Sequence, residues 1–150
     1  MIVAIDNNIL VNLVSDRAIY NNLETFLHQN NAILLIPTPV IAEFTAHDFN
    51  KRRIQLLAYE HSKVLTGILD KKASLITGEL AFKLHKDIFN EHKQKVKVDL
   101  QIIAIALANG AEILLSEDTG IQKCVNNLEL DLKIYSRYDL KIGLDLFDDE

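Results

Sequence analysis

The chain has 150 residues, of which 49% are hydrophobic and 25% charged, and its formal net charge is −5. This size and balance are typical of one globular domain, so we expect a single domain over residues 1–150 with a frayed C-terminal end. The lone Cys124 excludes an intrachain disulfide and a cysteine-rich metal centre. The N-terminal apolar run is too short for a signal peptide, and no stretch approaches the ~20 apolar residues that cross a bilayer. We therefore expect a cytoplasmic protein without a membrane partner.

The first apolar run, residues 2–5, predicts a strand that is covered on both faces. Two stretches of helical spacing follow it, and Ser15 is the expected N-cap of the second. The second helix carries an apolar stripe at helical spacing: Ile19, Leu23, Phe26 and Leu27. A second strand is predicted over residues 32–36.

The next helix is predicted to begin at Thr38 as N-cap, with Pro39 at the first helical position. Glu43 lies between the apolar positions of this helix, which predicts a half-buried carboxylate that needs a partner. A longer amphipathic helix is predicted over residues 49–70.

A short extended piece over residues 74–76 should then lead to a helix over 78–92, capped by Thr77. This helix and the one over 49–70 are both amphipathic, which makes a homodimer plausible.

The last third begins with a helix that is apolar almost all round, so it should be buried. Asp99 should open this helix and Gly110 should cap its C-terminal end. Residues 112–115 predict a buried strand. Alternating apolar residues over 128–134 predict a strand with one exposed face near an edge of the sheet.

Strands that alternate with helices indicate an α/β fold. We expect a three-layer α/β/α arrangement with a mostly parallel central sheet of four or five strands.

In such a sheet, ligands bind at the carboxyl ends of the strands. Asp6 directly follows the first strand, Asp118 lies just beyond strand 112–115, and Asp99 and Glu43 are expected at the same rim. Each acid also has a simpler interpretation. Asp6 could cap a helix, Asp99 could stabilise the positive end of one, and Asp118 could be a turn residue.

The acids taken together favour a site, because four carboxylates cannot stay ionised side by side without cations between them. Oxygen ligands suit Mg²⁺ or Mn²⁺ rather than zinc.

Three segments, "AIDNNILVNL", "IPTPVIAEF" and "KVDLQIIAIALANGAEILLSED", resemble the PIN-domain nucleases, including the toxin component of VapBC-type toxin–antitoxin pairs. The resemblance covers the chain from Ile2 to about Tyr135. It implies a Mg²⁺- or Mn²⁺-dependent endoribonuclease, with RNA as substrate, a small antitoxin protein as partner and a homodimer as assembly. The acids that it implies as both catalytic and metal-binding residues are Asp6, Glu43, Asp99 and Asp118.

Two further positions match the family. Asn8 matches a polar residue two places after the first acid, and Ser116 matches the Thr or Ser that precedes the fourth. Asn7 departs from the family, since Thr or Ser is more usual there, and residues 45–72 look expanded. Glu117 is a rival for the fourth acid, although the register favours Asp118.

The charge distribution bears on the substrate. Residues 51–97 hold 11 Lys and Arg against 5 Asp and Glu, whereas the rest of the chain holds 5 against 16. Lys93, Lys95 and Lys97 directly precede Asp99 and are candidates for contacts with RNA phosphates. Solvated helix faces and a solvated loop explain the same charges, and both interpretations stay open.

Other functions fit parts of the pattern. A phosphatase or phospho-acceptor domain would use the same rim, but such phosphatases want a second Asp where Asn8 stands. A catalytically silent PIN-like interaction module is the other alternative. Histidine acid–base catalysis is disfavoured, because a metal-bound water needs no imidazole and histidine is common on helix faces. The histidines considered are His47, His61, His85 and His92.

Overall fold

The computed structural model describes residues 1–59, 61–84 and 93–141, and its centre is a five-stranded parallel sheet with the order β3-β2-β1-β4-β5. This confirms the predicted α/β class with a parallel central sheet. The strands are β1 (Ile2–Ile5), β2 (Ile33–Pro37), β3 (Val64–Gly67), β4 (Ile113–Leu115) and β5 (Lys133–Tyr135).

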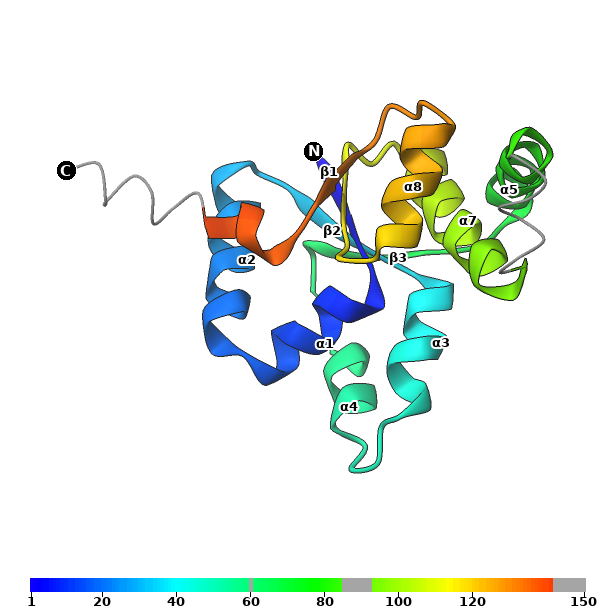
Figure 1. Cartoon of the computed structure of the whole chain (residues 1–150). Helices are drawn as coiled ribbons and strands as arrows, with labels where there is room; N and C mark the ends of the chain where they lie inside the picture. The colour runs from blue at the N-terminus through cyan, green and yellow to red at the C-terminus, as the bar shows by residue number, and fades with distance from the viewer. Residues whose placement is uncertain (60, 85–92, 142–150) are drawn as a thin grey trace.

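Helices flank the sheet, with α1 and α2 on one side and α5 and α7 on the other (Figure 1). They are α1 (Asn7–Ser15), α2 (Arg17–Gln29), α3 (Thr38–Ala46), α4 (Arg52–Ala58), α5 (Lys71–Lys83), α7 (Lys93–Ala108) and α8 (Thr119–Asn127), followed by the 3₁₀ helix η1 (Arg137–Lys141). No helix within the described part of the chain is both long and apolar enough to cross a membrane.

The core forms where the central strands meet α7. Strands β1 and β4 are almost wholly buried because both lie inside the sheet and are covered on both faces. The apolar run of α7 is buried as predicted, and Gly110 ends that helix at a positive φ of 73°. Cys124 packs into the same core.

The predicted long helix over 49–70 is wrong. The chain forms the short helix α4 and then the edge strand β3, which pairs with β2 in parallel. The predicted helix included Leu65 and Ile68, but Leu65 lies in β3 and Ile68 follows it. The pairing with β2 joins residues that are distant in the chain, so the spacing of apolar residues within this segment does not reveal the strand.

The predicted extended piece over 74–76 is also wrong, because these residues belong to α5. Asp70 caps this helix through a 2.9 Å hydrogen bond from the backbone N–H of Ala73. Thr77 lies inside the helix and donates its hydroxyl to the carbonyl of Ala73. Asp70 ahead of this stretch was the capping signal that sequence analysis missed. The predicted helix over 78–92 is not continuous, because α5 ends at Lys83 and Leu84 has an extended backbone; residues 85–92 lie outside the described part.

Two helix starts also differ from prediction. Asp16, not Ser15, caps α2, because the Asp16 carboxylate accepts from the N–H of Ala18. Pro37 stands at the N-cap of α3 without a side-chain bond, and Thr38 is already helical.

The last strand, predicted over 128–134, is only β5, because Glu129 turns the chain at a φ of 51°. Its predicted place at an edge of the sheet is confirmed. The predicted frayed end lies outside the described residues.

Candidate active site

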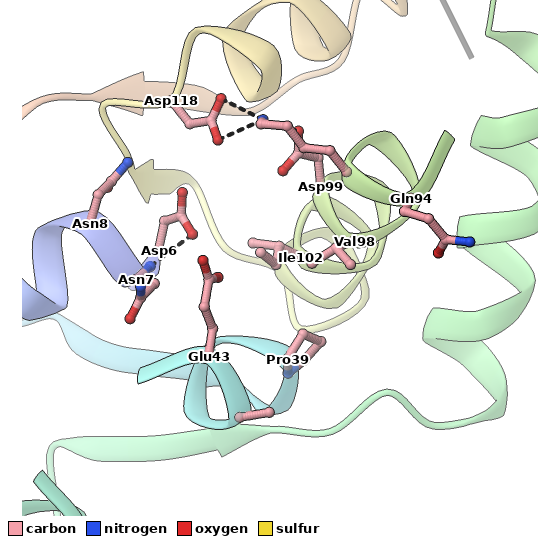
Figure 2. A pocket seen from close by; sticks show the side chains of 12 residues that line it. Asp6, Asn7, Asn8, Pro39, Glu43, Gln94, Val98, Asp99, Ile102 and Asp118 are labelled. Atoms are coloured by element: carbon pink, nitrogen blue, oxygen red, sulfur yellow. Dashed lines mark hydrogen bonds and ion pairs between the residues drawn. The ribbon is translucent and has the colours of Figure 1, made fainter. Parts of the chain in front are cut away.

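The four acids singled out in the sequence line one pocket of about 560 Å³ at the carboxyl edge of the sheet. They come from four separate elements: Asp6 from the end of β1, Glu43 from α3, Asp99 from α7 and Asp118 from the start of α8. Figure 2 shows their side chains directed toward a common space. The predicted convergence at one rim is therefore present.

Strand register brings the first and last acids together. Ile5 of β1 pairs with Leu115 of β4, so the residues that follow them, Asp6 and Ser116, leave the sheet side by side. The Ser116 hydroxyl donates to Asp6 Oδ2 at 2.7 Å and accepts from the backbone N–H of Asp118 at 3.0 Å. One buried hydroxyl thus links the Asp6 carboxylate to the backbone of Asp118, a residue far away in the chain.

Asp6 and Asp118 also perform the structural roles weighed against function. Asp6 is the N-cap of α1, where it accepts from the N–H of Asn7, and Asp118 is the N-cap of α8, where it accepts from the N–H of Gly120. Each carboxylate also faces the pocket, so capping and a place at the site are compatible. The cap bonds fix the direction of both side chains.

We had expected Asp99 to open its helix, but it does not. Helix α7 already runs from Lys93, so Asp99 lies in its second turn, and the simpler interpretation as a residue at the helix end is wrong. Asp99 is only 5% exposed. A buried carboxylate that does not serve as a cap needs another partner.

That partner is Lys95, one turn earlier on the same helix. Its ammonium group lies 3.0 Å from Asp99 Oδ2 and 2.9 and 3.0 Å from the two oxygens of Asp118. Sequence analysis had considered Lys95 only for RNA contact and missed this role, although its spacing of four residues from Asp99 is a known signal for a helical ion pair. Lys97 is exposed, and the side chain of Lys93 lies outside the described part.

Glu43 differs from the expectation of half burial, because its side chain is exposed on the rim of the pocket. Glu117, the rival for the fourth acid, pairs with Arg137 at 3.1 Å, while Asp118 lines the pocket. Asn8 accepts a 3.3 Å hydrogen bond from the backbone N–H of Glu117 and ties the loop after β4 to α1.

Electrostatics separate the four acids. Burial raises the pKa of Asp99 to about 6, and repulsion from Asp118 and Asp6 acts in the same direction, while the Lys95 ammonium offsets part of the rise. Burial likewise raises the pKa of Asp6, and partial desolvation at the rim together with repulsion from Asp6 and Asp118 raises that of Glu43. The pKa of Asp118 is lowered, because the hydrogen bond and charge of Lys95 and two backbone N–H groups outweigh burial. Asp6, Glu43 and Asp99 are therefore easier to protonate than free carboxyl groups, whereas Asp118 is harder to protonate.

The donor chemistry fits a hard divalent cation, because carboxylate oxygens are the ligands that Mg²⁺ and Mn²⁺ prefer. Within the described residues, however, no three Asp, Glu, His or Cys side chains form a ready-made metal-binding group. Of the four histidines considered, His47 and His61 are exposed and do not line the pocket, and the other two lie outside the described part.

Solved structures share this fold over nearly the whole chain. VapBC2 from Rickettsia felis, solved with a DNA fragment from its promoter, contains a chain that is 22% identical with a TM-score of 0.63; the match covers 91% of this chain and 98% of that one. The chain has the PIN-domain fold.

Two further structures with a PIN-domain fold agree. A chain of VapBC-1 from nontypeable Haemophilus influenzae is 20% identical, with a TM-score of 0.63 and coverage of 92% and 99% of the two chains. A chain of FitAcB from Neisseria gonorrhoeae is 15% identical, with a TM-score of 0.53 and coverage of 91% and 98%. No protein-family model and no curated protein matches the sequence. The resemblance to PIN domains is therefore confirmed at the level of the fold.

Proposed function

We propose that the protein is a Mg²⁺- or Mn²⁺-dependent endoribonuclease that hydrolyses RNA phosphodiester bonds. The observation that carries this proposal is the convergence of four carboxylates from four elements on one pocket of a PIN-domain fold. RNA as the substrate class rests on the PIN resemblance, and the basic middle segment is compatible with it.

The residues divide the work as follows. Asp6, Asp99 and Asp118 would hold the ion through carboxylate oxygens, and the buried Ser116 hydroxyl would keep Asp6 aimed at it. When bound, the ion supplies a water molecule of lowered pKa and offsets charge on the phosphate. Glu43, exposed at the rim with a raised pKa, would orient the attacking water by a hydrogen bond.

The test is RNA cleavage with purified protein in Mg²⁺ or Mn²⁺. We expect cutting to stop with EDTA and to fall by more than about 100-fold in Asp6→Asn, because a metal ligand and its hydrogen-bonded neighbours act together. Asp131→Asn makes the same chemical change at an exposed position outside the pocket and should cut normally. Cleavage that survives the chelator would refute the metal mechanism.

The alternative of a silent PIN-like module predicts a different result. A module without catalysis would bind no Mn²⁺ by calorimetry and cut no RNA, while its fold remained intact. A phosphatase would release phosphate from a small ester without cutting RNA. Calorimetry with Mn²⁺ and a phosphate-release assay on the same purified protein test these two alternatives.

We further propose a small antitoxin protein as a partner. The solved structures of similar fold are of VapBC and FitAB pairs, two of them bound to DNA. Co-expression with the product of an adjacent short reading frame should yield a stable complex in which RNA cleavage is suppressed. Light scattering on the protein alone tests the proposed homodimer.

A further inference from the structure

We propose that the Lys95 ammonium occupies the place of a second cation, so that this pocket takes up one divalent ion and not two. The inference rests on the proposed metal-dependent function. It assigns Lys95 a positioning role rather than a role in RNA binding.

The Lys95 ammonium lies between the carboxylates of Asp99 and Asp118. It bonds to both oxygens of Asp118 and to Oδ2 of Asp99, at distances of 2.9 to 3.0 Å. Both oxygens of Asp118 are thereby engaged by one cation, the Lys95 ammonium. A second divalent ion at this position would have to displace the lysine.

Gly120 leaves space beside the Lys95 ammonium. A Cβ added at this position would lie 2.8 Å from Lys95 Nζ and 3.0 and 3.1 Å from oxygens of Asp118 and Asp99. All three atoms are side-chain ends, so a larger residue at this position would fit only if the ammonium or a carboxylate shifted. Glycine in the first turn of α8 leaves the ion pairs undisturbed.

Lys95 is the only cationic side chain among the described residues that line the pocket. Asp6, Glu43 and the second oxygen of Asp99 lack a contact with Lys95, and Asn7 Oδ1 is buried without a hydrogen-bond partner. One divalent ion would bind on this side through Asp6 and Asp99, and it would share Asp118 with Lys95.

Charge favours the same stoichiometry. Four carboxylates and one ammonium sum to −3, since −4 + 1 = −3. One divalent ion brings this to −1, whereas a second would give a positive pocket and would also face the ammonium at close range. Lys95 lies one helical turn from Asp99 on α7, so the helix holds its side chain beside this carboxylate.

The experiment is the Mn²⁺ stoichiometry of the full chain, measured by calorimetry and by the electron paramagnetic resonance signal of bound Mn²⁺. Lys95→Met keeps the apolar stem and removes the charge, and Lys95→Gln repeats the test with a polar group. Lys97→Met is the matched control, because it removes the same charge from an exposed position on the same helix. Circular dichroism establishes that each variant is folded.

We expect one Mn²⁺ per chain in the wild type and in Lys97→Met, and two in both Lys95 variants. A spin-coupled signal from paired Mn²⁺ ions should accompany the second ion. Two ions in the wild type, or one ion in the folded Lys95 variants, would overturn the inference while leaving the metal-dependent function in place. No Mn²⁺ in any variant would overturn both proposals.

Discussion

At the residue scale, the site is built from groups that have a second role. Asp6 and Asp118 cap helices, Ser116 ties them together, and Lys95 neutralises part of their charge. A capping carboxylate is already ordered by a backbone N–H, so little further entropy is lost when it becomes a ligand. This double use explains why a simple interpretation of each acid alone was reasonable and still incomplete.

The buried hydroxyl of Ser116 gives a first prediction. Ser116→Ala removes the donor to Asp6 Oδ2 and the acceptor for the Asp118 N–H, so we expect RNA cleavage to fall about 10–100-fold. The free energy of unfolding should fall by about 1–3 kcal/mol, because buried polar groups lose their partners. Denaturation and initial cleavage rates measure both. Ser15→Ala, at an exposed helix end, should change neither by a comparable amount.

The pKa of Asp99 gives a second prediction, for metal-free protein. Its pKa is raised to about 6 in the folded state from a model-peptide value of 3.8. Between these values the folded state keeps a proton that the unfolded state has released, so the free energy of unfolding falls as pH rises through that window. Asp99→Asn removes this loss and should raise the free energy of unfolding by about 1–3 kcal/mol at pH 7.

The measurement is urea denaturation in EDTA from pH 4 to pH 7. The difference between Asp99→Asn and wild type should shrink toward zero as the pH is lowered to about 4. A difference that does not vary with pH would show that Asp99 does not titrate in this range.

At the element scale, the edge strand β3 depends on the close approach of helix α7. A Cβ at Gly67 would lie 2.6 Å from Ile105 Cγ2 and 3.1 Å from Leu35 Cγ. Glycine here lets the end of β3 fit between the neighbouring strand and the buried helix. This requirement comes from a contact across the sheet and leaves no mark on the local pattern.

A pair of glycine variants tests this packing. Gly67→Ala should lower the free energy of unfolding by about 1–3 kcal/mol, because the added methyl overpacks the core. Gly78→Ala, in the exposed middle of α5 with no atom within 4 Å of the added Cβ, should raise it by about 1 kcal/mol. Thermal or urea denaturation measures both. Equal effects in the two variants would contradict the packing argument.

At the scale of the whole molecule, folding brings four carboxylates into one pocket, where their mutual repulsion opposes folding. The parallel sheet gathers acids from distant parts of the chain at one rim, and the pKa of Asp6, of Glu43 and of Asp99 is raised there. A cation that binds the folded state alone would stabilise the fold by mass action.

This gives a further prediction. Mn²⁺ at about 100 times its dissociation constant should raise the free energy of unfolding of the wild type by about 2.7 kcal/mol, and EDTA should reverse the gain. Asp6→Asn should lose most of this gain, whereas Asp131→Asn should keep it. Thermal denaturation with and without Mn²⁺ measures the shift. An equal gain in Asp6→Asn would mean that the ion binds elsewhere.

The sequence by itself determined the elements whose signals are local and strong. The apolar runs of β1 and β2, the buried helix α7 and the cap at Gly110 are each set by a pattern within a few residues. Alternation of strands and helices then restricts the topology to a parallel sheet, and this places Asp6 and Asp118 at the same edge before any coordinates are known.

Only the tertiary structure decided the rest. Strand β3 forms because it pairs with the edge of β2. Leu65 fits helical spacing within its own segment, but that spacing does not report its pairing with a strand far away in the chain. The position of Lys95 between Asp99 and Asp118 depends on the packing of α7 against α8, where Gly120 leaves space for the ammonium. Sequence patterns report contacts within one turn or one strand, whereas strand pairing and the charge balance of a pocket depend on contacts between elements.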